Sequence, residues 1–435
     1  MPVGPPAGKT CLMSSQPMSA GSSEPASGAN RRFVVTASGT GINLALGVLY
    51  TWSMFKDAIG KELGWKGDRL NDPYALCCLV FSFAMILAGR CQDKVGPRAT
   101  ATIGGLLVGG GLLLISQTQS YAAWVLGFGG LVGAGIGFGY SSATPAALKW
   151  FPPSRTGLVA GVVVAGFGLA PVYLSPLSKY LLTAHGLRGA TFFYAFAFGI
   201  VVCGLAQLLA NPPAGYVPAG GAPPAPRTAP NPAAPGVAPG QILRLPTFYL
   251  LWAIYFIGAG AGLMVISSIS GLARKSMGDA AFVAVAVMAL GNAGGRIAAG
   301  FLSDKIGRRQ TLLLVLLFQA LLMFVAIPVA GAKGMAAGAV LLLATLIGFN
   351  YGAILSLFPS FTKDLWGLKN FGLNYGLLFT AWGLGGFVLS RVQQMLTASS
   401  GGSYTAAFTA AGCLLLLGAA LTRVLKSAQN RHMSG

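Results

Sequence analysis

A permanently charged side chain, Arg296, lies within an apolar stretch that runs from about residue 280 to residue 302. An arginine near the centre of a membrane-spanning helix costs about 2.5–3.5 kcal/mol on insertion scales, so such residues usually face a watery cavity and mark a substrate or ion pathway. Asn292 lies four residues earlier on the same helical face. We therefore predict that Arg296 binds an anion. The alternative is a side chain that snorkels to the lipid headgroups, because Arg296 lies past the middle of its helix.

Polar and aromatic residues inside other apolar stretches are further candidates for the same pocket. Tyr50 and Ser53 share a helical face, and the spacing of residues 375, 379 and 382 predicts an aromatic wall. For each aromatic residue the alternative is ordinary helix packing or a position at the membrane interface. The predicted pocket residues are Arg296, Asn292, Tyr140, Tyr50, Ser53, Asn350, Tyr351, Tyr375, Phe379 and Trp382.

Charge counting favours a substrate with a single negative charge. Arg296 is the one well-buried cation in the apolar stretches, and no buried carboxylate can be identified in them. Arg391 lies near the end of its stretch, which favours an interfacial anchor. One guanidinium forms a bidentate pair with one carboxylate, and a dianion would leave a second charge unmatched. We predict a small monocarboxylate. Lactate is the specific prediction because its hydroxyl could bond to Asn292, whereas acetate, pyruvate or formate would satisfy the arginine equally.

The composition indicates the class of protein that must position these residues. Hydrophobic residues make up 54% of the chain, charged residues only 9%, and there are 63 glycines. Soluble domains carry about 25% charged residues, whereas runs of roughly 20 apolar residues, as here, are typical of membrane-spanning helices. The net charge of +20 arises in short loops, so we expect no nucleic acid. No cysteine or histidine pattern predicts a metal site, and no Walker loop or other motif predicts a cofactor.

We predict an all-α polytopic membrane protein with twelve spans. In the first half they cover about residues 33–55, 73–90, 99–118, 122–148, 156–182 and 189–210, and in the second half about 247–272, 279–302, 310–331, 334–359, 372–395 and 404–425. The corresponding domains are a disordered tail (1–31), a six-helix bundle (32–210), a Pro/Ala/Gly-rich linker (211–245), a second six-helix bundle (246–426) and a short tail (427–435). Basic residues concentrate in alternate loops, which predicts that both termini and the linker are cytoplasmic.

One internal repeat is visible, because residues 88–98 (AGRCQDKVGPR) align with residues 299–309 (AGFLSDKIGRR). Each copy follows the second span of its half, and such repeats mark transporters built from two similar bundles. We expect the glycine to permit a tight turn, the aspartate to cap a helix, and the basic residues to hold the loop at the inner surface. The predicted conformational residues are Gly89, Asp93, Lys94, Arg98, Gly300, Asp304, Lys305, Arg308 and Arg309.

The paired loops, the twelve spans and the central linker together resemble the major facilitator superfamily over about residues 31–426. Four shorter motifs are similar to the oxalate/formate antiporters and their monocarboxylate-transporter relatives, including those of bacterial lactate-transporter type. These motifs are residues 135–140 (GIGFGY), 149–152 (KWFP), 166–168 (GFG) and 374–381 (NYGLLFTA). The resemblance implies two bundles that alternate access to a carboxylate site between them, with an essential arginine on the eighth span, the position of Arg296.

Two positions depart from the pattern of these relatives. Oxalate carriers have a lysine on the eleventh span, where this chain has Trp382. Eukaryotic lactate carriers place an aspartate four residues before the arginine, where this chain has Asn292. The first departure argues against a dianionic substrate, and the second removes a proton-carrying carboxylate.

The sequence thus predicts a secondary transporter, and not an enzyme, that moves L-lactate or a related monocarboxylate with protons by alternating access. A carboxylate antiporter of the oxalate/formate type is the alternative. A transporter-like membrane sensor is an alternative of another class, although neither tail is long enough for a sizeable output domain. If the rate of lactate uptake did not depend on an imposed pH gradient, proton symport would be excluded, and exchange or uniport would be favoured. We expect a monomer in a bacterial inner membrane, with lipid, protons and the substrate as its partners.

Overall fold

The structure is a computed structural model that describes residues 1, 26–213, 215–218, 236–278, 281–331 and 337–425. Every regular element among these residues is helical. The first half contains α1 (Ala26–Leu46), η1 (Gly47–Thr51), α2 (Trp52–Glu62), η2 (Gly67–Leu70), α3 (Asp72–Lys94), α4 (Pro97–Ser116), α5 (Tyr121–Trp124), η3 (Val125–Val132), α6 (Gly133–Leu148), η4 (Pro153–Arg155) and α7 (Thr156–Ala206). The second half contains α8 (Pro239–Ile242), α9 (Pro246–Met277), α10 (Ala281–Ile306), α11 (Arg308–Gly331), α12 (Ala337–Trp366), α13 (Phe371–Ser399) and α14 (Thr405–Val424).

Eleven helical segments of the described chain are long and apolar enough to cross a membrane. One of them, α7, consists of two helices joined at Gly186, whose φ of 63° requires the left-handed region that glycine tolerates. The next residue, Leu187, donates its backbone N–H to both carboxylate oxygens of Glu62, at 3.0 and 3.1 Å. Counted in this way the structure has twelve passes, as the sequence predicts.

Two of the passes are interrupted where the sequence predicts continuous helices. The first changes from α1 to the short 3₁₀-helix η1 and then to α2, and Tyr50 lies in this interruption. A side chain at Gly47 would overlap Ala170 of α7, so the chain comes unusually close to its neighbour there. The fourth pass contains a π-helical turn, η3, followed by α6. Such turns often occur at functional sites, because they shift the register of the following side chains.

The ends of the chain differ partly from the prediction. Helix α1 begins at Ala26, so residues 26–31 of the predicted tail are helical. The rest of that tail, most of the predicted linker and the predicted tail at 427–435 lie outside the described residues.

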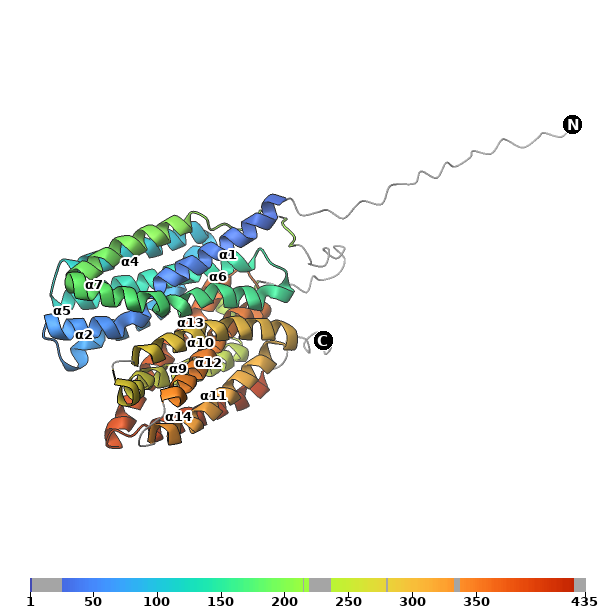
Figure 1. Cartoon of the computed structure of the whole chain (residues 1–435). Coiled ribbons are helices and arrows are strands. Elements are labelled where there is room, and N and C mark those ends of the chain that lie inside the picture. Colours follow the sequence, from blue (N-terminus) through green and yellow to red (C-terminus); the bar gives the residue numbers. More distant parts are fainter. Residues whose placement is uncertain (2–25, 214, 219–235, 279–280, 332–336, 426–435) are drawn as a thin grey trace.

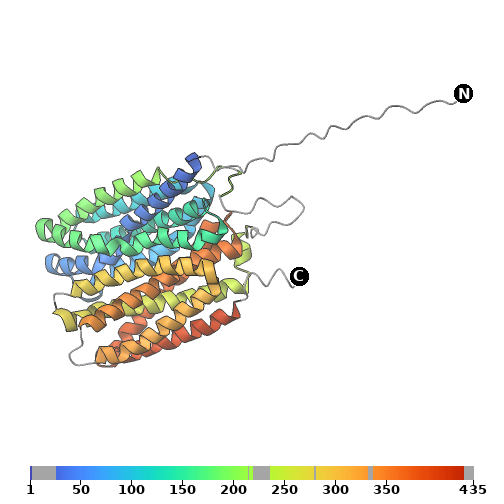
Figure 2. The same cartoon turned by 45° about the vertical axis from the view of Figure 1, so that its right-hand side comes forward.

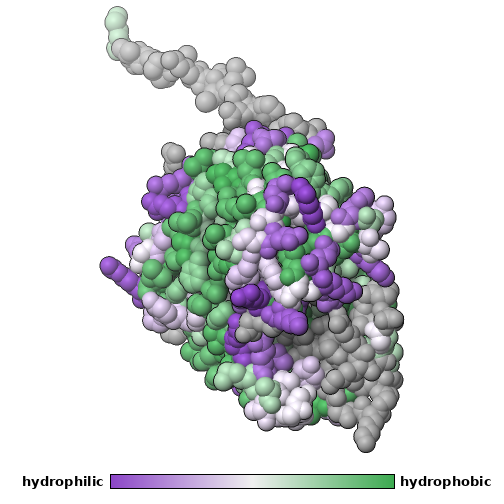
Figure 3. All heavy atoms as spheres, turned by 90° about the vertical axis from the view of Figure 1, so that its left-hand side faces the viewer, coloured by the Kyte–Doolittle hydropathy of each residue, from purple (hydrophilic) through white to green (hydrophobic). Residues whose placement is uncertain are grey.

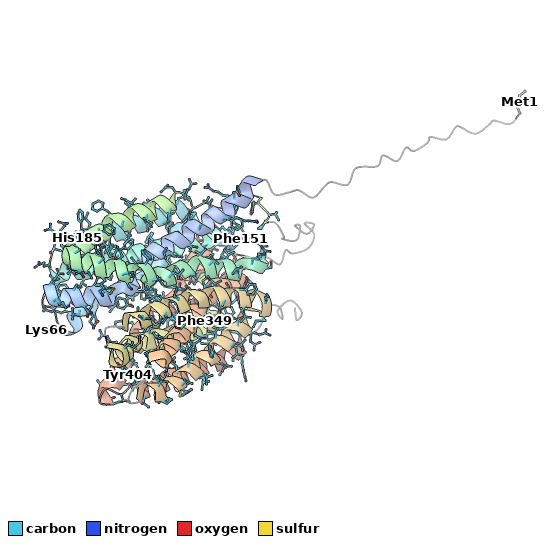
Figure 4. The ribbon with its side chains drawn as sticks, in the orientation of Figure 1. Met1, Lys66, Phe151, His185, Phe349 and Tyr404 are labelled. Carbon is cyan, nitrogen blue, oxygen red and sulfur yellow. The ribbon has the colours of Figure 1, made fainter. Side chains whose placement is uncertain are left out.

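The helices of the two halves form two adjacent groups, with α1–α7 on one side and α9–α14 on the other (Figures 1 and 2). The groups meet mainly where α3 packs on α13 and where α7 packs on α10. Helix α1 begins and α14 ends at the same end of the molecule, here called the termini end (Figure 1). Phe151 lies at this end, whereas Lys66, His185 and Tyr404 lie at the opposite end (Figure 4). Hydrophilic residues gather at that opposite end, between hydrophobic flanks (Figure 3).

Candidate functional site

The Arg296 side chain is fully buried between the two halves. Its Nε donates to Oδ1 of Asn292 at 2.9 Å, and its Nη1 donates to the backbone carbonyl of Val164, on α7 of the first half, at 2.5 Å. Its Nη2 is buried and has no hydrogen-bond partner among the described residues. The side chain therefore does not snorkel to the membrane surface, and it spans the interface between the halves.

Glycines on α10 and α7 bring the backbones close enough to hold Arg296 at this depth. On α10, Gly291 and Gly295 pack so tightly on α12 that an added Cβ would overlap the carbonyl oxygens of Thr345 and Phe349. Phe349 lies in the second half, between the two ends of the molecule (Figure 4). On α7, a Cβ at Gly168 would lie 3.2 Å from Oδ1 of Asn292 and 3.3 Å from Nε of Arg296. A larger residue would therefore overlap the α12 backbone at Gly291 or Gly295, and at Gly168 it would press on the Asn292–Arg296 pair.

Nη2 of Arg296 is the part of the guanidinium that remains for a ligand. The side chain bonds to Asn292 and Val164, and the Tyr140 hydroxyl also interacts with it. Nη2 is buried without a hydrogen-bond partner among the described residues, so its N–H donors can bind a ligand. Among the described residues no carboxylate forms an ion pair with Arg296. Its charge is therefore available to an anion.

Aromatic rings from both halves form a cluster, with Phe81 of α3 at its centre. The Phe81 ring lies 5.6 Å from Tyr140 and 6.0 Å from Phe167, both of the first half. It lies 5.1 Å from Phe379 and 5.2 Å from Trp382, both of α13. Sequence reasoning did not select Phe81 or Phe167 as pocket residues, because an apolar ring in an apolar helix carries no signal that separates it from ordinary packing.

Three phenols interact electrostatically with Arg296: Tyr140 of α6, Tyr255 of α9 and Tyr351 of α12. Tyr255 was absent from the predicted pocket, although its hydroxyl in an apolar helix is a signal that could have found it. Tyr50 interacts electrostatically with the same three phenols, so it lies in the same compartment. The structure thus brings Arg296 together with Asn292, Tyr140, Tyr351 and Tyr50.

The predicted residues of α13 line the same compartment: Tyr375 interacts electrostatically with Tyr140 and Tyr255, Phe379 lies 5.5 Å from the Tyr140 ring, and Trp382 donates to the Tyr351 hydroxyl at 2.9 Å. Tyr375 packs on Phe379 at 5.6 Å, and Phe379 stacks on Trp382 at 5.2 Å, so the three form one aromatic row along α13. Asn350 donates to the carbonyl of Leu346 in its own helix, and no described contact joins it to Arg296. Ser53 lies on α2, but its side chain is outside the described part of the structure.

The aspartates of the internal repeat each cap a helix of the opposite half. The two carboxylate oxygens of Asp93 accept the backbone N–H groups of Gly372 and Leu373, at the start of α13, at 3.0 and 2.9 Å. Those of Asp304 accept the N–H groups of Gly157 and Leu158, at the start of α7, both at 2.9 Å. A carboxylate at a helix N-terminus satisfies free N–H groups and complements the helix dipole. The pair therefore joins the halves at the termini end.

The cap at Asp304 has additional charged partners. Arg308 lies 2.7 Å from Asp304 and 2.9 Å from Asp364, and Lys363 lies 3.0 Å from Asp364. In the aligned repeat, Pro97 replaces Arg308, so Asp93 lacks the equivalent partner. Asp93 interacts electrostatically with Lys149 instead. Burial lowers the pKa of Lys149, and the negative charge of Asp93 opposes that shift.

The remaining residues of the repeat have local roles. Arg98 donates to the carbonyl of Leu209 at 2.9 Å, Arg309 donates to that of Thr422 at 3.1 Å, and Lys305 lies over the ring of Phe301. Lys94 is exposed to solvent.

The glycines of the repeat divide into two kinds. Gly89 and Gly300 lie inside helices, where an added Cβ would overlap the carbonyls of Gly372 and Gly157 across the interface. Gly96 and Gly307, with φ of 101° and 93°, are the ones that form the turns. The expected tight turn is thus at Gly96 and Gly307, whereas Gly89 and Gly300 permit close approach of the halves.

Comparisons with known proteins agree with this architecture. The sequence model of the Major Facilitator Superfamily matches residues 33–390. The oxalate:formate antiporter of Oxalobacter formigenes is 29% identical over 338 residues, which cover 77% of each chain. Monocarboxylate transporter 13 of Bos taurus is 27% identical over 387 residues, covering 86% of this chain and 84% of that one. The solved structure of the E. coli fucose:proton symporter FucP has the same fold, with a TM-score of 0.67 at 14% identity, covering 91% of this chain and 100% of that one.

Proposed function

Because the chain belongs to the Major Facilitator Superfamily, we propose that it is a secondary transporter of small monocarboxylates that binds the substrate carboxylate at Arg296. The observation that carries this proposal is the buried guanidinium, whose Nη2 has no hydrogen-bond partner and which forms no ion pair among the described residues. A buried cation of this kind is costly unless an anion joins it. The names of two relatives, an oxalate:formate antiporter and a monocarboxylate transporter, support a carboxylate as that anion.

The surroundings of Arg296 favour a substrate with one charge. The residue at the position of the second cation of oxalate carriers is Trp382, which is buried and neutral. The other described neighbours are phenols and apolar rings, which cannot neutralise a second carboxylate in a low dielectric. A monocarboxylate would leave the occupied site neutral.

Lactate is the proposed substrate because Asn292 can recognise a group beside the carboxylate. Its Oδ1 accepts from Nε of Arg296, which directs its Nδ2 donor elsewhere, and no described hydrogen bond uses that Nδ2. An amide N–H can donate to the hydroxyl oxygen of lactate or to the keto oxygen of pyruvate. Since Asn292 also holds the arginine, its removal would weaken every carboxylate to some degree.

Proton symport is the proposed mode of coupling. Within the described residues no carboxylate accompanies Arg296, so no protein acid at the site is available as the proton carrier. The substrate itself can carry the proton, because a protonated acid no longer pairs with the guanidinium and is released. On this proposal the termini end is cytoplasmic and the membrane is a bacterial inner membrane.

The test is uptake of labelled L-lactate into proteoliposomes, with and without a pH gradient. Wild-type uptake should saturate and should increase when the lumen is alkaline. Arg296→Ala should abolish it, and Arg296→Lys should reduce it at least about tenfold, because an ammonium lacks the planar fork. Arg391→Ala is the matched control, since Arg391 is exposed and lies over the Phe387 ring. Saturable uptake by a folded Arg296→Ala variant would refute the proposal.

Anion exchange is the second candidate, and one observation favours it. Arg296 has no counter-charge among the described residues. If the transporter changed between its two orientations without substrate, it would have to keep an unpaired cation buried, which is costly. A carrier that reorients only when loaded is an exchanger. Counterflow of labelled oxalate or lactate against an internal carboxylate, together with uptake that is indifferent to the pH gradient, would select this mode.

A further inference from the structure

A groove opens on the first half at the bend of α7, at the end of the molecule opposite the termini. Its lining comes from both arms of α7 (residues 156–185 and 187–206, on either side of Gly186) and from the end of α4, and its volume is about 980 Å³. His185, one of the lining residues, lies at this end of the molecule (Figure 4). Volumes of about 300–1,000 Å³ are typical of sites that hold small molecules, so the groove is large enough for one.

The groove lies on the outer flank of the first half, away from Arg296. The second arm of α7 packs on α4, where an added Cβ at Gly109 would lie 3.0 Å from the carbonyl oxygen of Ala195. These two helices lie along the edge of the first half that is farthest from α9–α14 (Figures 1 and 2). The first arm, by contrast, packs on α10, where a Cβ at Gly161 would overlap the backbone carbonyl of Arg296. The outer flank of such a bundle faces the acyl chains of the membrane, and the groove is therefore open to lipid.

Three phenylalanines of the second arm form an apolar wall of the groove. Phe192, Phe193 and Phe196 are 46%, 46% and 51% exposed, and the rings of Phe192 and Phe196 lie 5.0 Å apart. Phe196 comes eight residues after Arg188 in the same helix, which places it about 12 Å deeper along the helix axis at 1.5 Å per residue. The wall therefore runs from the end of the helix toward the middle of the membrane.

Polar side chains occupy the mouth of the groove. Arg188 donates from Nη2 to Oε1 of Gln117, at the end of α4, at 3.3 Å, and the Tyr180 ring lies edge-on to His185 at 6.4 Å. An added Cβ at Gly189 would lie 2.5 Å from the Cβ of His185, so the glycine leaves the space beside that side chain. All four polar side chains are exposed. They form a mouth that a charged group can reach from solvent.

The mouth carries a positive charge without a matching acid. The sequence has no Asp or Glu in residues 94–278, whereas Lys179 and Arg188 lie on either side of the bend. Glu62 is a carboxylate that contacts this corner, and it accepts the backbone N–H of Leu187. Among the described residues no ion pair joins it to Arg188. The planar fork of an arginine without a carboxylate partner is well suited to bind a phosphate.

We propose that this groove binds an anionic phospholipid of the adjacent leaflet, with the headgroup phosphate at Arg188 and an acyl chain along Phe192 and Phe196. The order of the groups matches that of a lipid, because the charged mouth lies at the helix end and the apolar wall lies deeper. Basic pockets between membrane-spanning helices bind anionic lipid headgroups. A free phosphate could use Arg188 but not the phenylalanine wall, so the combination favours a lipid.

The experiment counts the lipids that the full-length protein retains in native mass spectrometry. Protein in a mild detergent receives equal amounts of phosphatidylglycerol, which is anionic, and phosphatidylcholine, which is zwitterionic, with identical acyl chains. Wild type should retain one phosphatidylglycerol in preference to phosphatidylcholine. Arg188→Gln should reduce that preference about tenfold, because a hydrogen bond to a charged group is lost. Arg188→Lys keeps the charge but not the fork, so it should retain part of the preference.

Two further variants separate the headgroup contact from the acyl-chain contact. Phe192→Ala/Phe196→Ala should lower the retention of both lipids about equally, and it should fold, since both side chains are exposed. Arg391→Gln is the matched control: Arg391 is also exposed and lies over a phenylalanine ring, that of Phe387, but it is outside this groove. It should leave both the retention and the preference unchanged.

Several results would overturn the proposal. Equal retention of the two lipids by wild type, or an unchanged preference in Arg188→Gln, would show that Arg188 does not select the headgroup. Displacement of phosphatidylglycerol by equimolar glycerol 3-phosphate would identify a site for a soluble anion instead. A change from dimer to monomer in Phe192→Ala/Phe196→Ala, with lipid retention unchanged, would identify the wall as a contact between two copies of the chain.

The proposal remains testable if Arg188→Gln does not fold. Undiminished lipid retention in Phe192→Ala/Phe196→Ala would then refute it. None of these measurements requires transport, so their outcome is independent of the proposed function.

Discussion

Neutralising the two inter-half caps one at a time should open the termini end to different extents. Asp93→Asn keeps one carbonyl oxygen for the N-terminus of α13, but it loses the charge and one of the two bonds to Gly372 and Leu373. Asp304→Asn does the same at α7 and also removes the 2.7 Å ion pair with Arg308. The second substitution therefore removes more interactions than the first.

The magnitudes follow from these contacts. A hydrogen bond to a charged group contributes about 1.5–3 kcal/mol, and a charge at a helix N-terminus about 0.3–1 kcal/mol. Asp93→Asn should therefore shift the equilibrium toward an open termini end by about 2 kcal/mol, or roughly 30-fold in population. Asp304→Asn should shift it further, although Arg308 keeps its 2.9 Å pair with Asp364 and is not left unpaired.

The assay is a distance distribution between two spin labels on either side of the termini end. Val95 follows α3 and Ile306 ends α10, and both side chains are exposed, at 67% and 37%. Labels at these positions, in a background without the native cysteines, report the separation of the halves. We expect a longer distance to gain population in Asp93→Asn and to dominate in Asp304→Asn. Unchanged distributions in both variants, or a larger shift in Asp93→Asn, would refute the reasoning.

Two further predictions concern the packing that supports the site. Gly295→Ala should greatly reduce folding and yield, because its Cβ would overlap the Phe349 carbonyl; Gly294→Ala is the control and should be tolerated, since its Cβ would be 4.0 Å from the Phe349 ring. Gel filtration of the detergent-solubilised variants checks both, and equal yields would contradict the argument. Glu62→Gln should destabilise the fold by about 1–2 kcal/mol and so lower the melting temperature, because the Leu187 N–H loses a charged acceptor at the bend of α7. An unchanged melting curve would show that the bend does not need the Glu62 carboxylate.

The passes and the repeat could be predicted from the sequence because their signals are local. An apolar run of the required length predicts a span wherever it occurs, and the copies at 88–98 and 299–309 share six of eleven residues, including both Gly, the Asp and the Lys. The break at η1 was not predicted, since it depends on Ala170, a neighbour far away in the chain. The division of residues 156–210 into two passes was predicted, but the contact of Glu62 with Leu187 at the turn was not. Local patterns carry no information about such contacts.

The site was predictable in proportion to how unusual each residue is in its stretch. Arg296 and Asn292 are conspicuous in an apolar helix, and the structure joins them by a hydrogen bond. Phe81 is inconspicuous, although it is the centre of the ring cluster. The sequence also predicts that Asp93 can cap a helix, but not that the helix belongs to the opposite half.

The acceptor that Arg296 uses on α7 is the main-chain carbonyl of Val164, not a side chain. A peptide oxygen is present whatever residue occupies position 164. As long as the helix backbone keeps its position, a substitution there therefore does not remove the contact. One edge of the guanidinium is thereby oriented by backbone geometry. Attempts to change what binds at Arg296 would therefore do best to vary the side chains around the guanidinium, such as Asn292 and the neighbouring phenols.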